Sequence, residues 1–376
     1  MRAPTWTLWL GLALGLAACE GTELNMTPTV DAGAADSDAG VPEADTGVVE
    51  DAGVIEADAG VADDAGVEAD AGQSEPDAGQ PADAGPPPVR TPPPIPLYSE
   101  GACPTLMYGP TSAAGLNTGF MSGGYERQFR VLVPDNYDGT QDWPVVFAWH
   151  WLNASSNSFV QDGELESATA EMGFIAVLPD KRLRDNGNKA YQFDWPFVEV
   201  SQAESELVFF DDMLACVSEQ LRVDAERIYG IGVSAGALWL THLSTTDRVE
   251  HFAALESLSG GLGDVAGLWR MEYQPQTNKF PALVLWGGER DWLGVNFNDA
   301  SQRYRDALMS DGHFVLECVH DAGHAMPPIE PPPGAGTKFW SLWRFMLDHP
   351  YGLPAGTSPY QASGIPGGFP DWCRIP

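Results

Sequence analysis

Basic residues are scarce in this sequence of 376 residues: Lys and Arg together number 19, against 53 Asp and Glu, so the formal net charge at pH 7 is −34. A protein that binds nucleic acid neutralises phosphates with a basic surface, and this chain has too few cations to build one. Beyond residue 19, no apolar run reaches the roughly 18 residues that a transmembrane helix needs. The acidity therefore argues for solubility rather than for a nucleic-acid partner.

The stretch 20–97 lacks Trp and Phe and consists largely of Asp, Ala, Gly, Pro and Val. The tripeptide Asp-Ala-Gly recurs in it, starting at Asp31, Asp38, Asp51, Asp58, Asp64, Asp70, Asp77 and Asp83. A repeat can form a solenoid, but these repeats lack the large apolar residue that each turn of a solenoid buries. Low hydrophobicity with high charge instead predicts a disordered linker with a Pro-rich end. Residues 98–376 then form one globular domain.

The first 19 residues have the pattern of an export signal. Arg2 gives a positive start, residues 6–16 form an apolar run too short to span a bilayer, and a Leu-Ala-Ala-Cys sequence ending at Cys19 resembles a bacterial lipobox. Cleavage before that Cys makes it the lipidated first residue. We therefore expect an exported protein that is anchored through Cys19 at the outer membrane or cell surface. The alternative is an ordinary secretory signal, and the leaflet that holds the anchor stays open.

Cysteine is also scarce. Without Cys19 four remain, and none of their spacings is a C-x-x-C pattern: Cys103, Cys216, Cys318 and Cys373. An even number in an exported chain predicts two disulfides, with three pairings possible, and argues against a zinc site. Adjacent Asp211 and Asp212 do not suggest a metal pair either, because neighbouring residues on a helix point in different directions. We interpret them as a solvent-exposed helix face.

Apolar runs and amphipathic helical stretches alternate through residues 98–376, which is typical of an α/β fold with a mostly parallel sheet and helices on both faces. The predicted strands span residues 127–133, 144–149, 174–178, 227–231, 281–286 and 314–319, and the predicted helices span residues 163–171 and 206–221. The run 144–149 is continuously apolar, as expected of a central strand that is covered on both faces.

The predicted strand 227–231 runs directly into Gly-Val-Ser-Ala-Gly at residues 232–236, and the residues after it look helical. This G-x-S-x-G pentapeptide between a strand and a helix is typical of a nucleophile elbow, in which a strained turn presents the Ser234 hydroxyl above the sheet. The glycines are required because neighbouring backbone comes too close for a side chain. The helix N-terminus supplies N–H groups to a developing oxyanion. The alternative is a coincidental Gly-Ser-Gly turn.

At this point the chain resembles the α/β-hydrolase superfamily, and within it the secreted esterases grouped with polyhydroxybutyrate depolymerases and feruloyl or acetylxylan esterases. The resemblance rests on the segment 223–229 before the turn, on His150 at the end of an upstream strand and on Gly-His-Ala-Met-Pro at residues 323–327. It covers most of residues 98–376 and none of the linker. It implies an α/β-hydrolase fold and a triad in the chain order Ser, acid, His.

Asp291 follows the predicted strand 281–286 and matches the family's acid best, with Glu289 as the alternative. A buried carboxylate there would hold the imidazole in the correct tautomer. His324 matches the Gly-His-x-x-Pro loop of the family, and His320 is the alternative base. We therefore expect Ser234, His324 and Asp291 to form a catalytic triad; the alternative for Asp291 is a turn or helix cap.

The oxyanion loop of the family opens with His-Gly, and this chain has His150-Trp151 there. A backbone N–H of Trp151 or of Leu152 can still donate to the oxyanion, together with the N–H of Ala235, and which of the two donates stays open. Trp151 and Trp292 each adjoin a predicted catalytic loop. We expect both, with His150 as a further candidate, to bind substrate in an apolar or sugar-stacking pocket.

Together these residues predict a lipid-anchored serine carboxylesterase that hydrolyses a polyester or an acylated polysaccharide through an acyl-enzyme. We expect a monomer that needs no cofactor and no metal, with the ester substrate and the anchoring membrane as its partners. One alternative is a serine peptidase, which would use the same triad on the same fold. Another is a surface binding protein with a vestigial site. The fold does not identify the ester.

Overall fold

The computed structural model describes residues 88–265 and 269–376. At its centre is a nine-stranded sheet in the order β1-β2-β4-β3-β5-β6-β9-β10-β11. Neighbours from β4 to β10 are parallel, and the pairs β1–β2, β2–β4 and β10–β11 are antiparallel. The strands of this sheet are β1 (Leu116–Ser122), β2 (Tyr125–Leu132), β3 (Trp143–Trp149), β4 (Ile175–Pro179), β5 (Val223–Val233), β6 (Ala254–Leu258), β9 (Ala282–Trp286), β10 (Val315–Val319) and β11 (Cys373–Arg374). The predicted α/β class is confirmed.

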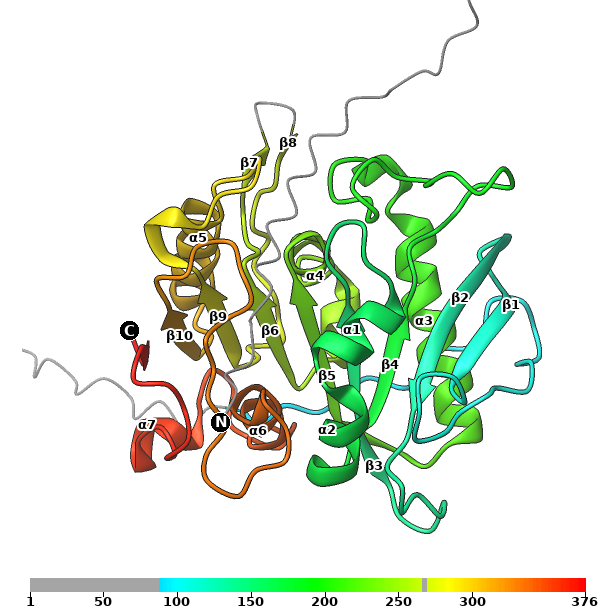
Figure 1. Cartoon of the computed structure of the whole chain (residues 1–376), viewed down its shortest axis with the longest axis horizontal. Coiled ribbons are helices and arrows are strands. Elements are labelled where there is room, and N and C mark those ends of the chain that lie inside the picture. Colours follow the sequence, from blue (N-terminus) through cyan, green and yellow to red (C-terminus); the bar gives the residue numbers. More distant parts are fainter. Residues whose placement is uncertain (1–87, 266–268) are drawn as a thin grey trace, which may run out of the picture. The chain divides into compact units, whose positions relative to one another are not determined.

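Helices cover both faces of this sheet, as Figure 1 shows. One face carries α3 (Glu204–Gln220), α4 (Ala235–Leu243) and α5 (Phe297–Ser310). The other face carries α1 (Ser156–Asp162), α2 (Leu165–Met172), α6 (Trp340–Leu347) and α7 (Pro359–Ser363). The remaining elements are the small sheet of β7 (Asp264–Val265) and β8 (Trp269–Arg270) and the 3₁₀ turns η1 (Val200–Gln202), η2 (Asp247–His251) and η3 (Gly288–Arg290).

Alternate residues of each central strand pack into different cores, because successive side chains of a strand point to opposite faces. In β3, Val145 and Phe147 pack on the α3 side, whereas Val146 and Ala148 pack on the α1 side. All seven residues of β3 are buried. The continuous apolar run therefore has the cause that the sequence predicted: a strand in the middle of a two-sided sheet.

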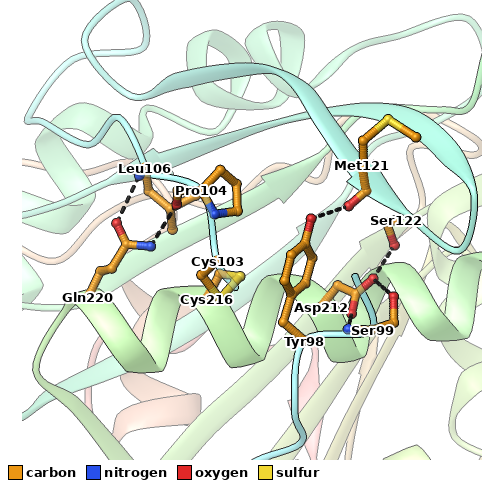
Figure 2. Close-up of a disulfide and its surroundings, with 10 residues drawn as sticks. All are labelled: Tyr98, Ser99, Cys103, Pro104, Leu106, Met121, Ser122, Asp212, Cys216 and Gln220. Atoms are coloured by element: carbon orange, nitrogen blue, oxygen red, sulfur yellow. Dashed lines mark hydrogen bonds between the residues drawn. A yellow bond between two sulfur atoms is a disulfide. The ribbon is translucent and has the colours of Figure 1, made fainter. Parts of the chain in front are cut away.

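Both predicted disulfides form, and the structure supplies their pairing: Cys103–Cys216 and Cys318–Cys373. The first joins α3 to the described segment before β1, residues 88–115, which we call the N-terminal segment. The second joins β10 to β11. Figure 2 shows a second link beside the first disulfide. There Gln220 donates to Pro104 O and accepts from Leu106 N–H.

The interpretation of Asp211 and Asp212 as an exposed helix face is wrong for Asp212, which is fully buried. Its carboxylate accepts hydrogen bonds from Ser99 N–H, Ser99 Oγ–H and Ser122 Oγ–H (Figure 2). A buried carboxylate must be hydrogen-bonded. Asp212 thus connects α3 to the N-terminal segment and to β1, contacts that helix periodicity alone does not reveal.

The packed part of the chain begins before the expected domain start at residue 98. The Arg90 guanidinium is buried and donates to Ala253 O and Asn278 Oδ1, both at 3.0 Å. It also lies over the ring of Tyr351, 4.8 Å from the centroid. At least residues 88–97 therefore belong to the domain and not to the predicted linker. Their Pro-rich sequence carries no apolar periodicity that would have indicated this.

The expected export signal, the lipidation site Cys19 and the Asp-Ala-Gly repeats lie outside the described residues. Within the described residues, no helix is long and apolar enough to cross a membrane. The same residues contain no group of three or more His, Cys, Asp or Glu side chains arranged to hold a metal ion.

Candidate active site

The pentapeptide around Ser234 forms a tight turn between β5 and α4. Ser234 has φ 55° and ψ −115°, a left-handed conformation that costs free energy for any residue with a side chain. A Cβ on Gly232 would lie 2.5 Å from Gly236 O, and a Cβ on Gly236 would lie 2.2 Å from Trp149 O. Both glycines are thus sterically required, as the sequence predicted: Gly232 because the turn folds back on itself, and Gly236 because the turn is pressed against the end of β3.

The structure brings Ser234, His324 and Asp291 together from three different connections. Ser234 Oγ lies 3.0 Å from His324 Nε2, and His324 Nδ1 lies 2.7 Å from Asp291 Oδ1. His324 lies in the loop after β10, and Asp291 follows η3 after β9. Both are at the carboxyl ends of parallel strands, which is where open α/β sheets gather their functional residues.

Asp291 is fully buried, and its second oxygen is also occupied. Asp291 Oδ2 accepts hydrogen bonds from Gly287 N–H at 2.7 Å and Ser259 Oγ–H at 2.8 Å. Burial alone would raise the pKa of Asp291, but the hydrogen bonds from His324, Gly287 and Ser259 outweigh burial and lower that pKa. The carboxylate is therefore held ionised and fixed in orientation next to the His324 ring. Asp291 is also the C-cap residue of η3, as the alternative interpretation predicted, but its carboxylate is in addition bound to the His324 ring.

The alternative residues do not reach Ser234. Glu289 is exposed on η3. His320 is buried, where its Nδ1 accepts from Ala322 N–H and its ring meets Trp372 edge-on. Burial lowers the pKa of His320. Its backbone N–H donates to Trp286 O, so this histidine has a structural place between β9 and β10.

Two further contacts of the triad were missed in the sequence. Ser259, which donates to Asp291, follows β6, a strand that the sequence did not predict. Phe297 stacks on the imidazole of His324, with ring centroids 4.4 Å apart and planes 14° apart. Phe297 begins α5, and its backbone N–H donates to Asp291 O. Neither residue belongs to a motif, so only the folded chain reveals them.

The residues predicted to supply the oxyanion donors either follow Ser234 directly or line the pocket beside it. Ala235 is the first residue of α4, so its N–H belongs to the unpaired N–H groups of a helix start. Trp151 and Leu152 line the same pocket as Ser234. His150 instead lies beneath its loop, fully buried, with its ring Nδ1–H donating to Trp151 O at 2.8 Å. The structure does not bring His150 into the pocket, because its ring packs against Trp195.

A pocket of about 360 Å³ opens beside Ser234 and His324. Its lining is largely apolar and is formed by Trp151, Leu152, Phe159, Ile231, Val233, Leu258, Leu285, Leu293, Met326, Phe339, Leu342 and Trp343. Trp292 does not line it but is 64% exposed on the surface next to Leu293, which is 61% exposed. Sequence reasoning found Trp151 and missed the aliphatic residues, which come from elements far apart in the chain.

Comparisons with known proteins relate this chain to hydrolases and esterases. No family model matches the chain. An oxidized polyvinyl alcohol hydrolase of Sphingopyxis is 25% identical over 341 residues, covering 74% of this chain and 88% of the relative. Feruloyl esterase D of Neurospora crassa is 26% identical over 147 residues, covering 36% of this chain and 44% of the relative.

Among solved structures, that of native sOPH superposes with a TM-score of 0.54 at 18% identity, covering 74% of this chain and 97% of the other. At that identity the likeness shows the fold alone. The sheet order and the turn at Ser234 show the fold of the α/β-hydrolase superfamily, and the likeness to hydrolases and esterases shows that the chain is a hydrolase similar to the esterases of that superfamily.

Proposed function

We propose that the chain is a serine carboxylesterase whose nucleophile is Ser234. His324 Nε2 takes the Ser234 hydroxyl proton as Oγ attacks the ester carbonyl, and the charged imidazolium is stabilised by Asp291. The protonated His324 then gives its proton to the leaving alcohol, which leaves the acyl group on Oγ. Water, deprotonated by the same His324, releases the acid and restores the hydroxyl. The continuous chain of contacts at 3.0 and 2.7 Å is the observation that carries this proposal.

The negative oxygen that forms during each attack needs hydrogen-bond donors. The N–H of Ala235 lies at the start of α4, where the helix dipole is positive, and the loop that holds Trp151 and Leu152 faces the same pocket. We propose Ala235 N–H as one donor and an N–H of Trp151 or Leu152 as the other. No residue of this scheme requires a metal or an organic cofactor.

The pocket supports an uncharged acyl group as the part of the substrate that binds beside Ser234. No described Lys or Arg lines the pocket, and besides His324 its one ionisable residue is Asp162. A carboxylate on the acyl group would therefore be buried without a cation, which is costly. The volume of about 360 Å³ is near the lower end for ligand pockets, which favours a short aliphatic chain or a single aromatic ring.

The wider substrate follows from the same surface and from the relatives. One relative is named a feruloyl esterase and another an oxidized polyvinyl alcohol hydrolase, so their names point to a feruloyl ester and to a polymer. We propose an ester on a polymer, either a polyester or an acylated polysaccharide, with Trp151 in the pocket and exposed Trp292 beside it contacting the chain outside. Activity on soluble esters that exceeds activity on every polymer would contradict the polymer assignment.

Export and anchoring are proposed from the sequence. Two disulfides agree with an oxidising compartment, where they form and persist. Lipidation of Cys19 would place the acidic, Pro-rich stretch between the anchor and the catalytic domain as a spacer. Growth with an azide-bearing fatty acid should label the wild-type chain and not Cys19→Ser; equal labelling of both would contradict an anchor at Cys19.

The experiment that tests the proposed function is hydrolysis of an ester panel by the wild-type chain and by Ser234→Ala. The panel contains p-nitrophenyl esters of rising chain length, methyl ferulate, acetylated xylan and polyhydroxybutyrate. Activity that disappears with Ser234→Ala and persists in Ser167→Ala, an exposed serine on α2, supports the esterase. Reaction with a fluorophosphonate together with cleavage of peptides alone would favour a peptidase. A native chain that neither reacts nor cleaves would favour a binding protein.

A further inference from the structure

The loop between β3 and α1, residues 150–155, is held in place by side chains of the segment between β4 and α3. The Asp194 carboxylate, fully buried, accepts a hydrogen bond from Asn153 N–H at 2.6 Å. Lys181 Nζ lies 3.2 Å from the same oxygen, and Lys189 Nζ lies 2.6 Å from the other. A buried carboxylate is stable only when it is paired in this way. Asp194 thus links the 150–155 loop to two lysines that are not part of the triad, Lys181 and Lys189.

The two lysines also bind the loop directly. Lys181 Nζ donates to Ala154 O at 2.8 Å, and Lys189 Nζ donates to Asn153 Oδ1. Asn153 has φ 64°, in the left-handed region that few residues adopt without support. The Asp194 carboxylate therefore holds the N–H of Asn153, Lys189 holds the Asn153 side chain, and Lys181 holds the C=O of Ala154.

The other end of the loop is held by the neighbour of Asp194. The buried indole of Trp195 donates its Nε1–H to His150 O at 2.9 Å, and its ring lies 4.8 Å from the His150 ring. His150 in turn donates to Trp151 O, which also accepts from Ala154 N–H at 3.1 Å. The carbonyls of residues 150 and 151 are thus both fixed.

Fixing these carbonyls also fixes the N–H groups of the same peptide units. A trans peptide group is planar, and its N–H points opposite to its C=O. The contact at His150 O therefore sets the direction of Trp151 N–H, and the contacts at Trp151 O set the direction of Leu152 N–H. These are the two candidate oxyanion donors, and both belong to the held part of the loop.

We propose that Asp194 is a positioning residue that holds the oxyanion donors of this enzyme through Asn153. The inference rests on the proposed esterase function. Trp151 replaces the glycine found in this loop in the family that the chain resembles, and the grip of Asp194, Lys181 and Lys189 keeps the bulkier loop in place. Misplacing a catalytic group by about 1 Å costs on the order of a hundredfold in rate, and losing one oxyanion donor costs roughly a hundredfold to a thousandfold.

The test compares Asp194→Asn with Asp311→Asn in the full chain. Asp311 is a matched control because it also accepts a backbone N–H, from Gln276 at 2.9 Å, and pairs with a lysine, Lys279, at 2.6 Å. For each variant we would measure kcat and KM on p-nitrophenyl butyrate. We would also measure inhibition by an alkyl trifluoromethyl ketone, on which Ser Oγ adds to the carbonyl to form an oxyanion that needs the same donors.

The proposal predicts that Asp194→Asn lowers kcat by about ten- to a hundredfold, leaves KM within about threefold and weakens the ketone by the same factor as kcat/KM. Asp311→Asn should leave all three values unchanged. A variant Asp194→Asn that loses stability but keeps kcat and ketone affinity would overturn the proposal, as would one that changes KM alone. If Asp194→Asn does not fold, the same measurements are made on Lys189→Met. A loss in its kcat and ketone affinity supports the proposal, and unchanged values overturn it. An inactive wild type that no fluorophosphonate labels would instead refute the proposed function.

Discussion

Glu256 lies in the middle of β6, where its neighbours in register are Ile231 and Leu283. It is fully buried, and neither carboxyl oxygen has a hydrogen-bond partner among the described residues. An ionised carboxylate in such a place would be very costly. Burial therefore raises the pKa of Glu256 well above its ordinary value of 4.5, so the folded chain keeps this proton to a higher pH than the unfolded chain does.

This raised pKa makes the folded chain less stable as pH rises. Above pH 4.5 the unfolded chain releases the Glu256 proton while the folded chain keeps it, so the folded state binds more protons. The free energy of unfolding then falls by about 1.4 kcal/mol for each pH unit, until the pH reaches the raised pKa of the folded state. In Glu256→Gln this contribution is absent. The difference in stability between variant and wild type should therefore grow in favour of the variant by the same amount per unit.

Urea unfolding of both proteins at pH 6, 7 and 8 measures this difference, and groups that the two chains share cancel in it. Glu256→Met should show the same pH dependence as Glu256→Gln. It should also be more stable than Glu256→Gln at every pH, because the buried amide of the Gln side chain has no partners, which costs about 1–3 kcal/mol. A stability difference that stays constant from pH 6 to 8 would refute the reasoning, since it would mean that burial does not raise the pKa of Glu256 into this range.

Three further predictions concern the site. Gly236→Ala should abolish soluble expression or activity, because its Cβ would lie 2.2 Å from Trp149 O. The control Gly367→Ala should be tolerated, since its Cβ would have no atom within 4 Å. Near-normal activity of Gly236→Ala would contradict the turn geometry. Asp291→Asn should lower kcat by roughly a thousand- to ten-thousandfold with little change in the melting temperature, since an amide no longer holds the imidazole in the correct tautomer. A loss in kcat under tenfold, measured by steady-state kinetics, would contradict this role of Asp291. Ser259→Ala should lower kcat only about tenfold. A hydrogen bond to a charged group contributes about 1.5–3 kcal/mol, and Gly287 N–H still holds the same Asp291 oxygen in this variant. A loss as large as that of Asp291→Asn would contradict this supporting role of Ser259.

Local sequence signals predicted much of the structure. The turn at Ser234 is readable because its glycines, strand and helix are contiguous, and Asp291 and His324 follow apolar strands in a known chain order. The structure brings the three together as the sequence predicted; their catalytic roles stay a prediction until they are tested. Continuous motifs thus carried the prediction of the triad geometry.

Long-range contacts were beyond the sequence. Strand β6 was missed because a glutamate interrupts its short apolar run, and only the sheet on both sides makes a buried Glu256 acceptable. Asp194 stands in a stretch without helical or strand periodicity, yet it binds Asn153, which is 41 residues away. Arg90 likewise lies in a Pro-rich segment and binds Ala253 across 163 residues. Such partners are fixed by tertiary packing, which no local pattern encodes.

The central claim is that Ser234 carries the acyl group during turnover. The most direct measurement is the mass of the Ser234 peptide after the wild-type chain is mixed with p-nitrophenyl butyrate and quenched in acid within milliseconds. We expect one butyryl group on that peptide and a burst of one p-nitrophenol per chain. Full turnover by Ser234→Ala, or turnover by the wild type with the adduct on another residue, would contradict it.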